Sequence, residues 1–213
     1  MVAAVVPVKN LKSAKSRLGG ILSEGERQEL VIAMLRDVIK ALKGSRPITK
    51  VFIVADTPLF DHLGVETIVE TKNRGYDEAI IEALKDNRVK LSISMLVLPA
   101  DLPLISSGEL DALVTQHSKR GLRIAGARDG DGTNALLMTP PNLLDTKFGK
   151  GSFERHKKEA LSIAAPVEVI NLPGFAFDVD TEQDLIDFIK IESDTNTYRF
   201  LDESGVIDRL INL

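Results

Sequence analysis

Residues 93–104 read I-S-M-L-V-L-P-A-D-L-P-L. The first six form a short, nearly continuous apolar run, which is typical of a strand buried on both faces of a parallel sheet. The run ends at Pro99, which has no N–H to donate to a neighbouring strand. Asp101 follows two residues later, where a charge is costly unless a cation meets it. The stretch therefore predicts both a buried sheet and a charged site at the end of a strand.

Similar apolar runs alternate with helical patterns along the rest of the chain. Further strands are expected at residues 2–6, 51–55, 67–70, 124–127, 135–139 and 167–170. Helices are expected over 76–85 and after Ser23, Ser106, Ser152 and Thr181. The alternation predicts an α/β fold, in which a mainly parallel sheet carries helices on both faces. The strand order cannot be read from the sequence.

Bulk composition excludes several classes of protein. The 213 residues contain no repeat and no linker, so residues 1–213 are predicted to form a single domain. The net charge of −4 provides no basic field for nucleic acid or an anionic membrane. The absence of cysteine excludes disulfides, thiolate metal sites and a cysteine nucleophile, and it fits the reducing cytoplasm. The apolar N-terminus is too short for a signal sequence or a membrane span.

A basic loop follows the first expected strand. Residues 7–20 place Lys9, Lys12, Lys15 and Arg17 close together in an acidic chain. Such a cluster suits a triphosphate, because cations offset its charge and guanidinium groups bind phosphate oxygens in pairs. The alternative is a solvated basic loop. Neither G-x-x-x-x-G-K nor G-x-G-x-x-G occurs, so any nucleotide is held differently from a P-loop or Rossmann protein.

Three carboxylates stand at the ends of apolar segments. Asp101 follows the strand quoted above, and Asp178 and Asp180 form an Asp-x-Asp pair whose side chains share one face of an extended segment. Carboxylates from separate strand ends can hold Mg²⁺, which completes its octahedron with phosphate and water oxygens. For Asp180, a role at the helix start beside Thr181 is an equal alternative.

A second candidate site lies in two glycine-rich turns. Thr133 and Asn134 follow the turn at 129–132, and Gly149 precedes the helix that starts at Ser152. A helix N-terminus with free N–H groups is an anion site, so these residues are predicted to bind a small phosphorylated acid. A plain hairpin turn and an ordinary helix start explain them equally well.

Other polar residues are less informative. His62 and His117 are expected at the surface, and His156 is expected at a solvated helix position, with the anion of the second site as an alternative partner. Asn73 and Gly75 form another candidate ligand-binding turn, for which a plain loop is an equal explanation. No G-x-S-x-G supports a serine hydrolase.

The C-terminal residues 196–213 form an expected helical arm. Val206, Ile207, Leu210 and Ile211 recur at helical spacing, so their apolar stripe must be covered. The cover is either the chain's own core or a second subunit, and we favour a homodimer.

Five motifs occur in order from residue 6 to residue 181. They are P-V-K-x-L-x-x-A-K-S-R-L, L-P-A-D-L-P-L, D-G-T-N-A-L-L, F-G-x-G-S-F-x-x-H and F-D-V-D-T. In this set the chain resembles the 2-phospho-L-lactate guanylyltransferases of the deazaflavin coenzyme F-420 pathway. The resemblance implies the nucleotide-diphospho-sugar transferase-like (Rossmann-like) three-layer sandwich that molybdopterin guanylyltransferases share. The wider fold family usually has a glycine-rich first loop with an R-M-G core, whereas this chain has K-S-R-L-G-G, so detailed phosphate contacts cannot be carried over.

The resemblance also implies a reaction. GTP and (2S)-2-phospholactate would give lactyl-diphospho-guanosine and pyrophosphate, with Mg²⁺ held by the three aspartates and the acid bound by Thr133, Gly149 and Ser152. The substrate's own phosphate attacks the α-phosphorus, so no protein base is required. Alignment, charge neutralisation by Mg²⁺, and Lys15 and Arg17 acting on the departing pyrophosphate would then provide catalysis.

Two alternatives remain from the sequence. The same fold could act on another phosphorylated acceptor: phosphoenolpyruvate, 3-phosphoglycerate, a sugar phosphate or a molybdopterin. A catalytically idle nucleotide-binding subunit is the second, and the retained Asp101, Asp178 and Asp180 argue against it.

Overall fold

The computed structural model describes residues 1–8, 11, 14–58, 60–70, 75–115 and 120–212. The strands are β1 Val2–Pro7, β2 Ile48–Ala55, β3 Glu66–Val69, β4 Ser94–Val97, β5 Gly121–Gly126, β6 Thr133–Thr139 and β7 Val167–Val169. The α-helices are α1 Glu24–Gly44, α2 Tyr76–Lys85, α3 Asn87–Lys90, α4 Ser107–Thr115, α5 Ser152–Ser162, α6 Pro173–Ala176, α7 Glu182–Ile189, α8 Asn196–Glu203 and α9 Val206–Ile211. Two short 3₁₀ helices, η2 Ser16–Leu18 and η3 Asp61–Leu63, complete the described elements.

The strands of the described residues form one mixed sheet in the order β3-β2-β1-β4-β6-β5-β7. Every pairing is parallel except those of β6, which runs antiparallel to β4 and to β5. The hairpin that joins β5 to β6 explains the reversal, because a short turn can only join antiparallel neighbours. The predicted, mainly parallel sheet is confirmed, and β6 begins at the edge of the sheet where its neighbours β4 and β5 end.

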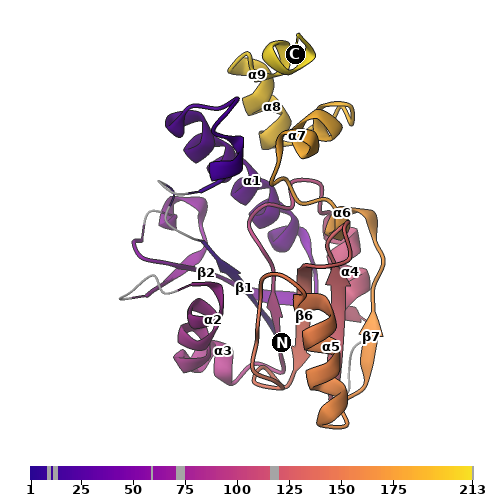
Figure 1. Ribbon diagram of the computed structural model, residues 1–213. Helices are drawn as coiled ribbons and strands as arrows, with labels where there is room; N and C mark the ends of the chain where they lie inside the picture. The colour runs from indigo at the N-terminus through magenta and orange to yellow at the C-terminus, as the bar shows by residue number, and fades with distance from the viewer. Residues whose placement is uncertain (9–10, 12–13, 59, 71–74, 116–119, 213) are drawn as a thin grey trace.

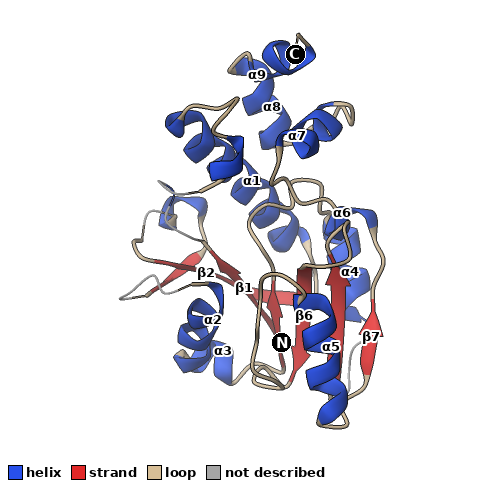
Figure 2. Ribbon diagram, in the orientation of Figure 1, coloured by secondary structure: helices blue, strands red, loops and turns tan. Residues whose placement is uncertain are grey.

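Helices cover both faces of the sheet, as Figures 1 and 2 show. Alternate strand residues point to opposite faces, so Ala4 and Leu96 pack with α1 and α4. Phe52 and Met95 pack on the other face with α2, α3 and α5. The predicted three-layer arrangement is therefore confirmed. No described helix is long and apolar enough to cross a membrane.

The predicted helix starts follow from side-chain capping. Ser23 with Glu26 forms a capping box before α1, and Ser106 exchanges the same hydrogen bonds with Glu109 before α4. Thr181 caps α7. Each hydroxyl accepts from an N–H that has no partner within the helix, which is why these sequence positions mark the helix ends.

Strand β5 begins three residues before its predicted start. Arg123 breaks the apolar pattern there, yet it is only 2% exposed. Its guanidinium donates to both carboxylate oxygens of Glu168 on β7, at 2.7 and 2.8 Å, and to the carbonyl oxygen of Ala112 on α4. A buried arginine whose donors are satisfied in this way can occupy a strand that its charge would otherwise exclude.

The C-terminal helices pack on the side of α1 that faces away from the sheet. Val206 and Leu210 are buried in a separate cluster with Met34 of α1 and Phe188 of α7, and Figure 1 shows α7, α8 and α9 gathered above the sheet. Ile211 stays 71% exposed. The apolar stripe is thus covered largely within the chain, and the homodimer stays a prediction.

Candidate active site

The strand order reverses between β1 and β4. From β1 the chain moves outward to β2 and β3, and it then returns to the other side of β1 as β4. Ligands of such sheets bind beyond the carboxyl ends of the strands at this point. A cavity of about 340 Å³ opens there, and its lining includes Val8, Lys15, Arg17, Tyr76, Asp101 and Asp180. A larger cavity of about 490 Å³ is lined by α9 and residues 20–21, away from the strand ends.

Lys15 lies between two of the predicted carboxylates. Its Nζ is 2.6 Å from Oδ2 of Asp101 and 2.5 Å from Oδ1 of Asp180, and its side chain is only 8% exposed. Burial alone lowers the pKa of Lys15, but the two carboxylates outweigh this effect and raise the pKa above its ordinary value. The backbone of Lys15 is left-handed, at φ 51°, which is costly for a residue with a side chain and is typical of functional positions.

Asp178 is held by a residue that was predicted to bind substrate. The amide of Asn134 donates to Oδ1 of Asp178 at 3.1 Å and to the carbonyl oxygen of Phe175 at 2.9 Å. Burial raises the pKa of Asp178, and nearby Asp101 and Asp180 add to this effect. Asn134 therefore positions a carboxylate, a role that its place after a glycine turn did not indicate.

The three aspartates converge without forming a ready-made metal site. Within the described ranges, no group of three or more acidic or histidine side chains has the geometry to hold a metal ion. Asp101 and Asp180 nevertheless share one cation, the Lys15 ammonium group. Since Mg²⁺ commonly takes one or two protein carboxylates and completes its shell with substrate phosphates and water, the donor set fits Mg²⁺ bound together with a nucleotide.

The second predicted site is a buried hydroxyl and imidazole cluster. Thr133 Oγ1 lies 3.1 Å from Ser152 Oγ and 3.1 Å from His156 Nδ1. All three residues are at most 6% exposed. The expectation that His156 is solvated is therefore wrong, because the ring closes the space between β6 and α5. Burial, together with the neighbouring Arg155 charge, lowers its pKa to about 4.

The turn before α5 uses glycine where backbone geometry requires it. Gly149 has φ 96° and Gly151 has φ 71°. The backbone N–H of Ser152 donates to Gly149 O, and that of Phe153 donates to Asp131 O. These two N–H groups at the helix start are thus already paired, so the predicted anion site would depend on side-chain hydroxyls rather than on them.

Tyr76 connects the cavity to the second site. Its ring centroid is 4.5 Å from that of Phe148, and the Phe148 ring is 4.9 Å from that of His156. The Tyr76 hydroxyl is buried and has no hydrogen-bond partner among the described residues. The helical pattern over 76–85 gives Tyr76 no role, although its position directly after Gly75 is a signal that it lies near a ligand loop.

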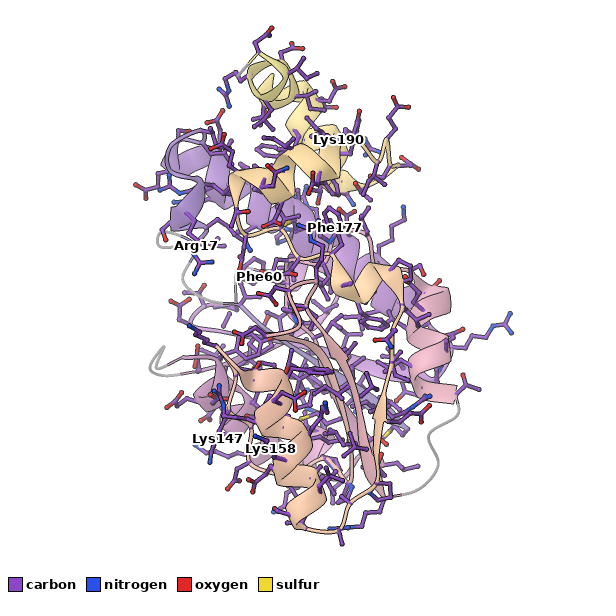
Figure 3. All side chains as sticks on the ribbon, turned by 45° about the vertical axis from the view of Figure 1, so that its right-hand side comes forward. Arg17, Phe60, Lys147, Lys158, Phe177 and Lys190 are labelled. Atoms are coloured by element: carbon purple, nitrogen blue, oxygen red, sulfur yellow. The ribbon has the colours of Figure 1, made fainter. Side chains whose placement is uncertain are left out.

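Of the remaining predicted residues, some lie among the described residues and others lie outside them. Arg17 is exposed at the cavity, and Figure 3 shows it at the level between the upper helices and the sheet. Gly75 has φ 128°, a conformation that favours glycine, and it is the N-cap residue directly before α2. The predictions for Lys9 and Asn73 lie outside the described residues, as does that for His117. His62 is exposed, as predicted.

The amino-acid sequence matches a known protein family. Residues 2–208 match the family described as "Guanylyl transferase CofC like". The chain belongs to this family. It is 36% identical over 187 residues to a phosphoenolpyruvate guanylyltransferase of Sphaerobacter thermophilus, covering 85% of this chain and 89% of that one. A 2-phospho-L-lactate guanylyltransferase of Methanocaldococcus jannaschii is 31% identical over 206 residues, 95% of this chain and 88% of that one.

A solved structure supports the fold of this CofC-like chain independently. The crystal structure of a protein assigned as a nucleotide-diphospho-sugar transferase, from Desulfovibrio desulfuricans G20, superposes with a TM-score of 0.77 at 16% identity. The superposition covers 99% of this chain and 96% of that one. At this identity the match shows the fold alone, and it confirms the predicted fold family. The family match shows that the chain is a guanylyltransferase, as its motifs predicted.

Proposed function

We propose that the chain transfers GMP from GTP to a small 2-phosphorylated carboxylic acid and releases pyrophosphate. The observation that carries the proposal is the pairing of Lys15 with Asp101 and Asp180 inside the cavity at the strand-order reversal. A cation and two carboxylates at this place suit a metal-bound triphosphate. The absence of cysteine favours the cytoplasm as its compartment.

Each substrate has its own group of side chains. The triphosphate would occupy the cavity, where Lys15 and Arg17 offer positive charge to its oxygens. The phosphorylated acid would contact Thr133 and Ser152, at the start of β6 and of α5. Because β6 is antiparallel to β4, its first residues adjoin the strand end that leads to Asp101. The two groups therefore belong to the same edge of the sheet.

The residues present fit the chemistry of such a transfer. The acceptor phosphate is itself the nucleophile, so the site needs alignment and charge neutralisation rather than a protein base. Asp101 and Asp180 would hold Mg²⁺, with Asp178 kept in place beside them by Asn134. The bound Mg²⁺ would supply charge neutralisation at the triphosphate. Lys15 and Arg17 would stabilise the leaving pyrophosphate.

The acceptor has two candidates that share one chemistry. (2S)-2-Phospholactate is the acceptor that the sequence motifs imply, and the methanogen relative carries that name. Phosphoenolpyruvate is the second candidate, because the bacterial relative at 36% identity is named for it. Both are three-carbon acids with a phosphate on the second carbon, and they differ in the geometry of that carbon.

Pyrophosphate release provides the test. Purified protein is incubated with Mg²⁺, each of the four nucleoside triphosphates and each acceptor, and the product is identified by mass spectrometry. We expect turnover with GTP and with at least one of the two three-carbon acids. The Asp101→Asn variant removes one negative charge at nearly constant volume and should be inactive. Turnover with a sugar phosphate alone, or equal turnover by Asp101→Asn, would contradict the proposal.

A further inference from the structure

The hydrogen bonds around His156 determine which ring nitrogen carries the proton. The backbone N–H of Lys147 lies 2.9 Å from Nε2 and can only donate. Nε2 therefore presents a lone pair. A neutral imidazole must then carry its proton on Nδ1, which lies 3.1 Å from Thr133 Oγ1 and donates to it.

Thr133 receives a second hydrogen bond on the same oxygen. Ser152 Oγ donates to Thr133 Oγ1 at 3.1 Å. A hydroxyl oxygen accepts two hydrogen bonds and donates one, so its acceptor capacity is filled. Its own proton must point elsewhere, and the described part of the chain offers it no acceptor. A buried donor without an acceptor is costly in the free protein.

We infer that His156 is a positioning residue, which directs the Thr133 hydroxyl proton toward an anionic oxygen of the bound acid. The inference rests on the proposed function, since it deepens the role of the second site. Phosphate and carboxylate oxygens accept hydrogen bonds and have no proton to offer at neutral pH. A Thr133 hydroxyl that can only donate therefore favours an anionic oxygen, because a hydrogen bond to a charged acceptor is stronger than one to a neutral alcohol oxygen.

The ring is held firmly enough to perform this role. His156 is 1% exposed, and the Phe148 ring meets it edge-on with centroids 4.9 Å apart. The Lys147 N–H fixes one side of the imidazole and Thr133 the other. Rotation of the ring would exchange the two nitrogens with carbon atoms and break both hydrogen bonds.

Two substitutions separate the two halves of this hydrogen-bond relay. In His156→Asn the side-chain amide can take the place of Nδ1–H and donate to Thr133. In His156→Gln the longer amide reaches the place of Nε2, accepts from Lys147 and leaves Thr133 without its donor. We expect His156→Gln to raise the Michaelis constant for the acid about tenfold, and His156→Asn to stay within about threefold of the wild type. The constant for GTP should hardly change in either variant.

A double-mutant cycle distinguishes positioning from general damage. In a Thr133→Val background the hydroxyl is absent, so adding His156→Gln should leave the constant for the acid unchanged. Equal effects of Asn and Gln on both substrates, or additive effects in the cycle, would overturn the inference.

Nitrogen NMR of the imidazole provides a measurement that does not depend on activity. With ¹⁵N-labelled histidine, the His156 ring should show protonation on Nδ1 at neutral pH, and the His156→Gln variant assigns its signals. Protonation on Nε2 would overturn the inference even in an active enzyme. An Nδ1-protonated ring in a protein without turnover on any phosphorylated acid would contradict the proposed function instead.

Discussion

The Nζ atom of Lys15 lies 2.6 Å from Oδ2 of Asp101, although 86 positions separate the two residues in the sequence. The same ammonium group also contacts Asp180. In the free protein Lys15 is thus the cation that neutralises these carboxylates. Mg²⁺ would need the same oxygens, so we expect lysine and metal to compete until a triphosphate draws the lysine toward its own oxygens.

Replacing Lys15 by methionine should therefore destabilise the free protein. The change keeps a long side chain but leaves two carboxylates facing each other, which we expect to cost about 1–3 kcal/mol of unfolding free energy. Millimolar Mg²⁺ should recover part of this loss in Lys15→Met and should affect the wild type less. Urea unfolding with and without Mg²⁺ measures both effects. Lys15→Arg keeps the charge and serves as the matched control; equal stability of all three proteins would contradict the pairing.

Arg17 should behave differently from its neighbour. It is exposed at the cavity, so Arg17→Ala removes positive charge without disturbing the core. We expect the Michaelis constant for GTP to rise about tenfold, while the melting temperature stays within about one degree. Steady-state kinetics and a thermal scan suffice. An unchanged constant would mean that Arg17 belongs to a solvated loop, the alternative that its sequence leaves open.

Removing the Tyr76 hydroxyl should affect protein stability and substrate binding in different ways. It is buried beside Asp101 and has no hydrogen-bond partner among the described residues, and burial raises its pKa well above the usual range. Removing such a group in Tyr76→Phe should leave the protein equally stable or up to about 1 kcal/mol more stable. Substrate constants should rise several-fold, because a bound ligand is the natural partner for the hydroxyl. A clear loss of stability would show that the hydroxyl is already satisfied.

Much of the fold follows from patterns that act locally. Ser23 and Ser106 mark helix starts because capping depends on residues three positions apart. The apolar run before Pro99 marks a strand in the same way. The pairing of β6 with β4 and the burial of Arg123 depend on contacts between distant segments, and no local pattern encodes those.

In the candidate site, too, local features could be predicted from the sequence and contacts between distant segments could not. The motifs identified Asp101 and Thr133, whose places at strand ends are a local property. They did not show that Lys15 forms ion pairs with Asp101 and Asp180, or that Asn134 donates a hydrogen bond to Asp178. Both contacts join segments that only the fold brings together. His156 was misassigned because a polar residue on a helix is usually solvated, whereas here two hydrogen bonds offset its burial.

Stability should depend on pH through His156. Burial, outweighing the opposing effect of Asp77 and assisted by Arg155, lowers the pKa of His156 to about 4 from an ordinary 6.5. Between these values the unfolded chain binds more protons than the folded one, so stability is full above pH 6.5 and falls as the pH drops toward 4. The loss between pH 7 and pH 5 should be roughly 2 kcal/mol.

The matched variant for this test is His156→Gln, which cannot titrate in that range. Its urea unfolding free energy should be lower than that of the wild type at pH 7, but it should change less between pH 7 and pH 5. Identical pH dependence in the two proteins would mean that the pKa of His156 in the folded protein lies near its ordinary value and that its burial is incomplete.

Asp37 of α1 ties the C-terminal arm to that helix. Asp37 is 4% exposed, and its two carboxylate oxygens accept four hydrogen bonds from the backbone and side chains of Asn196 and Thr197, at 2.7–2.9 Å. Asp37→Asn removes the negative charge and replaces one of the two acceptor oxygens by an NH₂ group. This NH₂ group would face the N–H and O–H donors of Asn196 and Thr197. We expect a loss of about 2–4 kcal/mol of unfolding free energy and faster proteolysis within α8 and α9. Asp208→Asn, the same change at an exposed position of α9, should cost less than about 0.5 kcal/mol. If the two variants unfold at the same urea concentration, Asp37 does not anchor the C-terminal arm. The apolar contacts between the arm and α1 alone must then hold the arm in place.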